Sequence, residues 1–402
     1  MYHARTKPLG DFMKVPIFRH DLGPWHADQV AKVLSSAFLT SGSIGREVET
    51  RLCSYFGTKH AALVNSWTNG AISALLALDI GRGDEVIVPA QTFIATANVV
   101  ELVGAKPVFV DVDRSTLLIT PQGVRQALTP RTRAVLPVHL YGQMVDVETL
   151  KAELSDRPDI SIIEDSAHCF EGERNGSKPG RHSTCAIFSF YATKNVTCGE
   201  GGALVTNDDS LFERFMQTRM HGMSSAAVDR FRLGLYRHWD MSRLGMKANL
   251  PDLLACLLPE QIDSIDRKLS RREEISYVYE RAFAETPIRL PSRICNAKHA
   301  RHLFVIHVDA NIRDEAIRVL GDNGIGVTVN YRSVPTLTFY QQKYRYGAGD
   351  FPTSYEWGEG TISLPLYLSL TRQEQEHVIA VIRNHIVPMI EQMNRTVPQA
   401  RS

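Results

Sequence analysis

The chain has 402 residues, and its 45 lysines and arginines nearly balance its 44 aspartates and glutamates, which leaves a formal net charge of +1. A nearly neutral chain argues against a surface devoted to a polyanion, so we expect no nucleic-acid partner. The hydrophobic content of 44% and the charged content of 22% are ordinary for a globular protein. A chain of this length can bury a large core and divide into two domains.

The six cysteines are scattered along the chain without a CxxC pair. This pattern favours free thiols in a reducing compartment over a disulfide framework or a zinc site. No other group of His, Cys and Asp has ligand spacing, so we expect no metal. The sequence contains no apolar run of 18 residues, and the first residues, MYHARTKPLGDF, lack the apolar region of a signal peptide. We therefore expect a cytoplasmic protein without a membrane partner.

Residues 1–25 contain three prolines and predict an irregular N-terminal arm. Beyond the arm, apolar periodicity predicts helices that alternate with short strands. The predicted helices are 26–38, 46–56, 71–78, 95–103, 120–128, 147–154 and 209–220. The predicted strands are 60–65, 84–89, 104–111, 133–138, 160–163, 185–190 and 203–206. Strands that are apolar on both faces and alternate with helices indicate an α/β fold, with a mostly parallel sheet between helical layers.

The last third of the chain predicts a smaller α+β domain. It follows the segment 221–251, which is polar, aromatic and glycine-rich, and loops of this length are usually functional or face a partner. The elements predicted after this loop are helices at 253–269, 270–284, 314–323 and 372–393 and strands at 301–309 and 324–330. We place the large domain at 26–265 and the small C-terminal domain at 266–402.

A carboxylate and a lysine follow two of the predicted strands. Asp165 comes directly after the strand 160–163, and Lys194 follows the strand 185–190. Ligands of parallel sheets gather outside the carboxyl ends of the strands. A lysine amine there can form a Schiff base with pyridoxal 5′-phosphate (PLP), and an acid can keep the pyridine nitrogen protonated. The pair suits a PLP site, although two unrelated surface residues would give the same pattern.

A phosphate site is predicted at Ser66-Trp67-Thr68, between a strand and a helix. The backbone N–H groups and the dipole of a helix N-terminus favour an anion. A plain N-cap by Ser66 or Thr68 explains the same residues. Phe93 lies just past the strand 84–89, where its ring either stacks on a cofactor or packs in the core.

Five stretches together resemble the DegT/DnrJ/EryC1/StrS family, the PLP-dependent aminotransferases of nucleotide-sugar biosynthesis. They are LTSGSIGREVE (39–49), the segment 77–113, PVHLYGQ (137–143), IIEDSAH (162–168) and IFSFYATKNVTCGEGGALVTND (187–208). These stretches span most of the first two-thirds of the chain in the order of the family. The matches at 324–326 and 364–366 are weaker.

The resemblance implies the fold of aspartate aminotransferase, fold type I. That fold has a large domain with a seven-stranded sheet, a small C-terminal domain, and a homodimer with shared active sites. It also implies transfer of an amino group from L-glutamate to a keto sugar. The segment 187–202 is more similar to the branch that aminates the 4-keto group of nucleotide-linked deoxyhexoses or pentoses than to the 3-keto branch.

The resemblance assigns roles to individual residues. By their place in the family motifs, Lys194 is the Schiff-base and proton-transferring lysine, Asp165 the partner of the pyridine nitrogen, His168 a neighbour of the cofactor ring, Phe93 the stacking aromatic, Ser189 and Thr68 phosphate-binding residues, and Asn249 a phosphate ligand lent by the neighbouring subunit.

Two positions depart from the family pattern. Trp67 stands between Ser66 and Thr68 where the family usually has glycine or alanine, so its side chain must point away from the phosphate or reach over the substrate. Ala248 stands where the family often has an aromatic residue. In the same long loop, Arg243 and Lys247 either meet a sugar-nucleotide diphosphate or belong to a solvated loop.

Three other functions are possible for a chain with this fold. The sugar dehydratases of the family carry histidine in place of the lysine, so Lys194 argues against that reaction. A non-catalytic protein on the same fold is disfavoured by the presence of Asp165, Lys194 and Ser189. A phosphate-binding α/β enzyme without PLP finds no support, because no GxGxxG motif follows a strand and no GxxxxGK[ST] motif is present.

Overall fold

The computed structural model describes residues 13–224 and 238–396. A seven-stranded sheet forms its centre, in the strand order β1-β8-β7-β5-β4-β2-β3. The strands are β1 (His60–Val64), β2 (Glu85–Pro89), β3 (Lys106–Val110), β4 (Thr132–Val135), β5 (Ser161–Asp165), β7 (Cys185–Ser189) and β8 (Gly202–Thr206). Only β8 runs antiparallel to its neighbours, and the remaining pairs are parallel. The mostly parallel α/β fold predicted from the sequence is confirmed.

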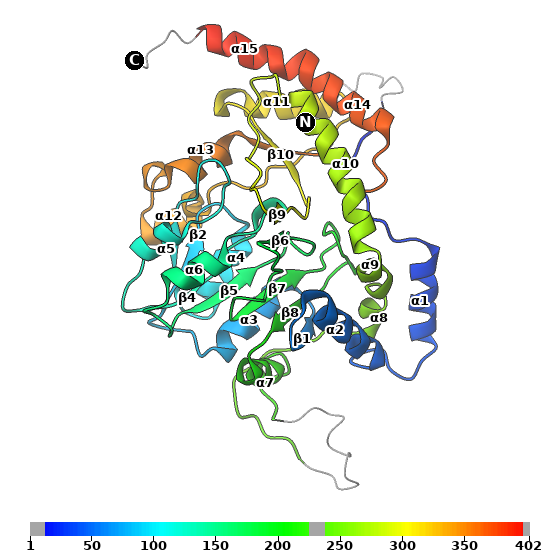
Figure 1. The fold of residues 1–402 in the computed structure, drawn as a ribbon, viewed down its shortest axis with the longest axis vertical. Coiled ribbons are helices and arrows are strands. Elements are labelled where there is room, and N and C mark those ends of the chain that lie inside the picture. Colours follow the sequence, from blue (N-terminus) through cyan, green and yellow to red (C-terminus); the bar gives the residue numbers. More distant parts are fainter. Residues whose placement is uncertain (1–12, 225–237, 397–402) are drawn as a thin grey trace, which may run out of the picture.

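Helices cover both faces of this sheet (Figure 1). One face packs against α3 (Trp67–Ala77), α4 (Ile94–Leu102) and α7 (Asp209–Thr218); the other packs against α2 (Ser43–Phe56), α5 (Pro121–Gln126) and α6 (Val147–Glu153). Successive side chains of β7 point to opposite faces of the sheet. Cys185 and Ile187 therefore pack in the core of α3 and α4, while Ala186 and Phe188 pack in the core of α2.

The helix ends follow local chemistry that the sequence carries. Helix α2 stops at Phe56 because Gly57 takes a left-handed conformation, with φ of 63°. Thr120 caps α5, and Pro121 occupies its first position. Helix α3 begins at Trp67, four residues earlier than predicted, because the Ser66 hydroxyl accepts a hydrogen bond from the Asn69 N–H group and caps the helix.

A smaller domain with its own core follows. Its two-stranded antiparallel sheet and its helices surround one apolar cluster. They are α10 (Ile265–Phe283), β10 (Phe304–His307), α11 (Ala310–Asp322), β11 (Thr361–Leu364), α14 (Arg372–Val381), a π-helical turn (Ile382–Ile386) and α15 (Val387–Thr396). Helix α10 runs from one domain to the other (Figure 1). Ile265 packs in the core of α2, whereas Tyr279 and Phe283 pack in the small domain, so the predicted boundary at 265 stays a prediction.

The remaining elements are shorter, and several of them pack on the large domain. They are α1 (Pro24–Leu34), a 3-10 turn (Leu140–Gly142), β6 (Glu173–Arg174), α8 (Asp252–Ala255), α9 (Pro259–Asp263), β9 (Ala297–Lys298), a 3-10 turn (Val334–Thr336), α12 (Thr338–Tyr344), a 3-10 turn (Ala348–Asp350) and α13 (Pro352–Gly360).

Two predicted elements are wrong. The helix predicted at 253–269 is broken into α8, α9 and the start of α10, because Pro259 opens a new helix. The strand predicted at 324–330 is reduced to single bridges, from Ile325 to Val15 and from Thr328 to Ser363. The sequence patterns also do not predict α12, α13 or β11.

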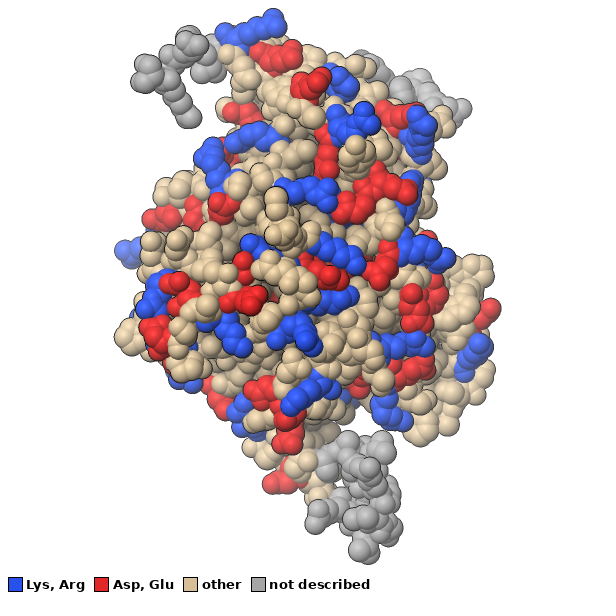
Figure 2. Space-filling model, in the orientation of Figure 1, with Lys and Arg blue, Asp and Glu red and all other residues tan. Residues whose placement is uncertain are grey.

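The described part of the N-terminal arm docks on the small domain. Val15 is fully buried in the core of that domain, and its N–H group donates to the carbonyl of Gly324. The first twelve residues of the predicted arm lie outside the described residues. Acidic and basic side chains alternate over the face that Figure 2 shows. Within residues 13–224 and 238–396, no helix is long and apolar enough to cross a bilayer.

One buried carboxylate fixes the start of α2 against the segment that carries Asn249. Asp252 is 3% exposed, and its Oδ1 atom accepts hydrogen bonds from the N–H groups of Gly42 and Gly45, both at 3.0 Å. Its Oδ2 atom accepts from Ile44 at 3.3 Å. A carboxylate at a helix N-terminus satisfies donors that have no partner within the helix.

We expect Asp252→Ala to lower the free energy of unfolding by about 2 kcal/mol, because one buried and two partly buried N–H groups lose a charged acceptor. Urea denaturation measures the change. Asp314→Ala is the control, since its side chain is 85% exposed and its ion pair with Arg313 lies at the surface; we expect less than about 0.5 kcal/mol. Equal midpoints for Asp252→Ala and the wild type would contradict this role of Asp252.

Candidate active site

A cavity of about 400 Å³ opens where β5 and β7 end beside the start of α3. Eight of the nine predicted site residues line it: Ser66, Trp67, Thr68, Phe93, Asp165, His168, Ser189 and Lys194. Strand pairing explains part of this arrangement. Asp165 lies opposite Ile187 in the parallel pair of β5 and β7, and the two-residue period turns Ile163 and Ile187 toward the core of α3 and α4. Asp165 and Ser189 follow the same period at the ends of their strands.

Asp165 is 6% exposed, and its carboxylate bonds to neutral donors. The Thr96 hydroxyl, on α4, donates to Oδ2 at 2.8 Å, and the Ala167 N–H group donates to Oδ1 at 3.2 Å. Burial raises the pKa of Asp165 above its ordinary value, although both hydrogen bonds and the nearby Lys194 act in the opposite direction. A cationic group in the cavity would compensate for this desolvation.

Lys194 lies in the turn after β7, where its N–H group donates to the carbonyl of Tyr191 at 2.9 Å. Its Nζ atom is 3.5 Å from the Nε2 atom of His302, in the small domain. Burial lowers the pKa of Lys194 from 10.5 to about 8, against the opposing effect of Asp165. Near neutral pH, Lys194 is therefore a neutral, nucleophilic amine in a larger fraction of the molecules than a lysine in solvent would be.

His168 contacts Tyr141 and Tyr331, which lie far apart in the sequence. Its Nδ1 atom accepts from the Tyr141 N–H group at 3.2 Å, and its Nε2 atom is 3.1 Å from the Tyr331 hydroxyl. Burial, with a smaller effect of Lys194, holds the pKa of His168 well below its ordinary value. The neutral ring thus carries its proton on Nε2 and donates to the tyrosine oxygen, whose own proton is free to face the cavity.

The start of α3 forms the polar end of the cavity. Ser66 caps the helix, as the plain N-cap interpretation predicts, and Thr68 and Ser189 also line the space. Trp67 lines the cavity as well, but it is 6% exposed and most of its side chain packs in the core between the sheet and α3. Gly202 permits this close approach, because a Cβ atom there would lie 2.5 Å from the carbonyl oxygen of Phe188 and 3.0 Å from the nitrogen of Trp67.

Phe93 lies at the edge of the cavity and is 51% exposed, so its interpretation as a core residue is wrong. Its ring centroid is 5.5 Å from that of Tyr331, at an interplanar angle of 46°. Two aromatic side chains from segments far apart in the sequence therefore border the same opening.

Asn249 is the predicted site residue that does not line this cavity. Its Nδ2 atom donates to the Ser41 hydroxyl at 2.8 Å, while its Oδ1 atom is buried without a hydrogen-bond partner. Rotating the amide by half a turn would let Oδ1 accept from Ser41 and would leave Nδ2 free to donate. Of the two loop cations, Arg243 pairs with Asp79 at 2.7 Å, and Lys247 is exposed.

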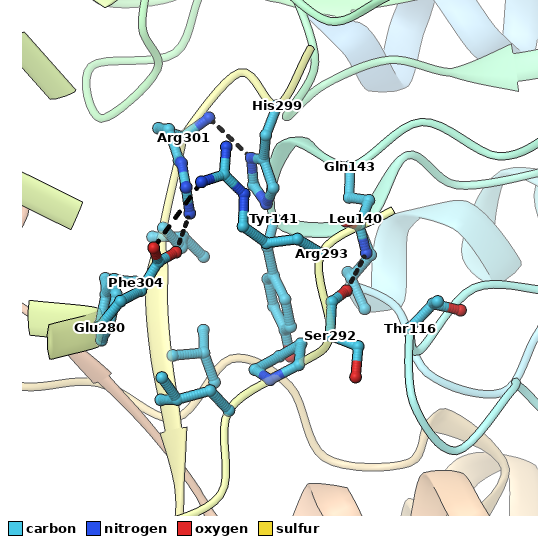
Figure 3. A pocket seen from close by; sticks show the side chains of 14 residues that line it. Thr116, Leu140, Tyr141, Gln143, Glu280, Ser292, Arg293, His299, Arg301 and Phe304 are labelled. Carbon is cyan, nitrogen blue, oxygen red and sulfur yellow. Dashed lines mark hydrogen bonds and ion pairs between the residues drawn. The ribbon is translucent and has the colours of Figure 1, made fainter. Parts of the chain in front are cut away.

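A second cavity, of about 320 Å³, is lined by Tyr141, Arg293 and Arg301 among others (Figure 3). Arg301 points to Glu280, with a 2.7 Å ion pair, and also pairs with Glu273 at 3.0 Å. Arg293 lies near the same two glutamates. Because these glutamates neutralise both arginines, the second cavity presents no unpaired arginine to a ligand.

The profile of the DegT/DnrJ/EryC1/StrS aminotransferase family matches residues 21–383. The chain belongs to this family. It aligns with a structure described as a sugar aminotransferase of Streptococcus pneumoniae in its pyridoxamine phosphate (PMP) form, at 28% identity over 94% of this chain and 100% of that one, with a TM-score of 0.87. Another structure of that protein is its PLP form.

Two further solved structures share the fold. DesV from S. venezuelae is 32% identical over 90% of this chain and 94% of its own, with a TM-score of 0.82. PseC from Helicobacter pylori, an aminotransferase of pseudoaminic acid biosynthesis, is 25% identical over 95% of this chain and 100% of its own, with a TM-score of 0.83. This protein is thus a PLP-dependent sugar aminotransferase of fold type I.

The cavity of this aminotransferase fits PLP by its own chemistry. Its volume is in the range of small-molecule sites. The buried Asp165 carboxylate suits a protonated pyridine nitrogen, the Lys194 amine suits an aldehyde, and the start of α3 suits a phosphate. Sequence reasoning missed Thr96, Tyr331 and His302. The first lies inside an ordinary helix pattern, and the other two lie far along the chain from the motifs of the site.

The depressed pKa predicts a pH profile for Lys194. In the PLP-free, full-length protein, its reaction with an amine-acylating reagent should be half-maximal near pH 8, because the reactive neutral amine forms above the pKa. Mass spectrometry of the peptide that contains Lys194 measures the rate. Asp165→Asn removes a charge that raises this pKa, so the midpoint should fall by about one unit. The urea-unfolded chain is the control, and a folded midpoint equal to its value would contradict the burial of the amine.

Proposed function

We propose that the enzyme transfers an amino group from L-glutamate to the 4-keto group of a nucleotide-linked deoxyhexose or pentose. The observation that carries this proposal is the enclosure of the Lys194 amine and the Asp165 carboxylate in one cavity at the ends of β5 and β7. Both groups are removed from water, and burial moves the pKa of each toward neutrality. That environment suits an amine that must alternate between nucleophile and base.

PLP, when bound, supplies an aldehyde that captures amines and a ring that withdraws electrons. In our proposal Lys194 binds the aldehyde carbon, and Asp165 holds a proton at the pyridine nitrogen. Thr68, Ser189 and the first N–H groups of α3, with Ser66 and Trp67 at its start, bind the phosphate. Phe93 and His168 border the ring. Once free, Lys194 would take a proton from the α-carbon of the donor and deliver it to the cofactor carbon that carried the aldehyde.

The sugar acceptor is supported by the relatives. The S. pneumoniae structure is described as a sugar aminotransferase, and PseC is described as an aminotransferase involved in the biosynthesis of pseudoaminic acid. The 4-keto position rests on the similarity of the segment 187–202 to the branch of the family that acts there. L-Glutamate is the donor by the same family inference.

We also propose a homodimer in which Asn249 serves the site of the neighbouring subunit. Asn249 lies outside the cavity of its own chain, yet its amide keeps one buried polar atom without a partner. A neighbouring phosphate would satisfy the amide after a half-turn rotation. A cytoplasmic location belongs to the proposal as well, because all six cysteines are free thiols.

The donor half-reaction is tested by the absorption spectrum of the PLP-loaded protein. L-Glutamate without a keto sugar should deplete the visible band, and D-glutamate should leave it unchanged. Lys194→Ala should abolish turnover, while Asp165→Asn should reduce turnover and keep the fold. A screen of 4-keto and 3-keto nucleotide sugars then identifies the acceptor. A band that ignores L-glutamate would exclude it as donor, and no band after added PLP would indicate a binding protein.

Mixed dimers test the role of Asn249. We expect Lys194→Ala and Asn249→Ala to be inactive or weak alone, and a refolded equimolar mixture to recover about one quarter of wild-type activity, because half of the dimers are mixed and each has one intact site. Mixing Lys194→Ala with Asp165→Asn is the matched control. Lys194 and Asp165 act in the same site of the same chain. Each subunit of that mixed dimer therefore has one damaged residue in its own site, no site is intact, and no recovery is expected. Equal lack of recovery in both mixtures would place Asn249 in its own chain's site.

A further inference from the structure

His302 is a buried histidine of the small domain that reaches the reactive lysine of the large domain. It lies two residues before β10, and its Nε2 atom is 3.5 Å from the Nζ atom of Lys194, 108 positions away in the sequence. No motif of the sequence assigns it a role. Its ring also lies against that of His168, with the centroids 4.3 Å apart.

The hydrogen bonds of Asn195 decide which nitrogen of His302 carries the proton. The Nδ2 atom of Asn195 donates to both carboxylate oxygens of Glu171, at 2.9 Å, and to the carbonyl of Ala300, at 2.7 Å. Its Oδ1 atom therefore faces the Nδ1 atom of His302, at 3.2 Å, as an acceptor. Because an amide oxygen can only accept, Nδ1 is the protonated nitrogen and Nε2 presents its lone pair to Lys194.

This arrangement is fixed by an ion pair behind it. Glu171 is fully buried and pairs with the buried Arg272 of α10 at 3.3 Å. Arg272 also donates to the backbone carbonyl of Asn195 at 3.3 Å. The residue that follows Lys194 in the chain is thus held by side chain and backbone, and the orientation of the His302 ring follows from it.

The charges around the pair keep the histidine neutral. Burial holds the pKa of His302 well below its ordinary value, with further effects of His168, Lys194 and Arg272 in the same direction. The other titratable groups that line the cavity of Lys194 are Asp165, His168, Tyr191, Glu200 and Tyr331. Among these, Asp165 raises the pKa of Lys194. The lone pair of a neutral histidine thus remains available to the amine across neutral pH.

Lys194 borders two spaces. Besides the cofactor-sized cavity, it lines a small one of about 20 Å³ that His302 also lines. The small cavity has room for about one water molecule and not for a substrate. The contact with His302 therefore occupies a position beside the cavity in which the donor and acceptor would react.

We propose that His302 is a positioning residue, whose Nε2 atom accepts a hydrogen bond from the free amine of Lys194 and holds that amine beside the cofactor cavity while substrate occupies it. This inference rests on the proposed role of Lys194 in the reaction. It gives the small domain a direct contact with the reacting amine, so that the placement of the lysine depends on how the two domains are packed.

Two amide substitutions separate this role from a structural one. In His302→Gln, the Oε1 atom can take the place of Nε2 and still accept from Lys194, while the bond to Asn195 is lost. In His302→Asn, the amide can still donate to Asn195, while the acceptor near Lys194 is lost. The two variants are matched in chemistry and differ in which of the two hydrogen bonds survives.

The first measurement is the pH profile of acylation of Lys194 in the PLP-free, full-length variants. We expect His302→Gln to keep the midpoint of the wild type. His302→Asn should lower it by about one unit, because the protonated amine loses an acceptor. The reverse pattern, equal shifts in both variants, or no shift in either would overturn the proposal, since each points to packing or to Asn195 alone.

The second measurement uses the PLP-loaded enzyme. His302→Asn should lower kcat about tenfold and increase the isotope effect with α-deuterated glutamate, because a misplaced amine slows proton transfer. KM should change little, and His302→Gln should restore most of kcat. A fall in kcat without a change in the isotope effect would overturn the proposal.

A third measurement needs no His302 variant. In wild-type protein with isotopically labelled histidine, solid-state NMR should show Nε2 of His302 as an unprotonated, hydrogen-bonded nitrogen, and Lys194→Met should shift that signal. A protonated Nε2 would overturn the proposal even if neither amide variant folds. Failure of the aminotransferase assay with normal results for the PLP-free protein would count against the proposed function and not against this contact.

Discussion

The site depends on the burial of two ionisable side chains, Asp165 and Lys194. Burial raises the pKa of Asp165 and lowers that of Lys194, so each is less charged than it would be in solvent. Thr96 and the Ala167 N–H group stabilise the carboxylate without neutralising it. The fold therefore holds a carboxylate ready for a cationic ring nitrogen and an amine ready to react. Both conditions suit PLP, the cofactor of the family to which the chain belongs.

The sheet makes this placement possible. Asp165 and Ser189 end two adjacent parallel strands, and the two-residue period sets both on the face that α3 and α4 cover. The antiparallel β8 returns beside β7 through Gly202, which lets its backbone lie close to the start of α3. The polar end of the cavity thus depends on a glycine that binds nothing itself.

Two side chains from the last third of the chain complete the site. Tyr331 meets His168 and borders the opening with Phe93, while His302 meets Lys194. Behind them, Glu171 of the large domain pairs with Arg272 of α10, the helix that packs in both cores. Movement of one domain against the other would change the surroundings of the lysine and of His168 together.

The sequence by itself determined the fold class, the cofactor chemistry and eight residues of the cavity, because each of these depends on local patterns. Strand ends mark Asp165 and Lys194, a polar turn before a helix marks Ser66 and Thr68, and the family motifs mark the rest. The prediction of one long helix at 253–269 was wrong, because the spacing of apolar residues does not indicate that a new helix begins at Pro259.

Only the tertiary structure decided which distant residues meet. Tyr331 and His302 lie more than one hundred positions from their partners, and no local pattern reports a contact between domains. The side of the helix on which Trp67 lies, the exposure of Phe93 and the unpartnered oxygen of Asn249 likewise follow from packing. Hydrophobic periodicity records which face of an element is buried, whereas the partner of a buried polar atom is chosen by the three-dimensional arrangement of the whole chain.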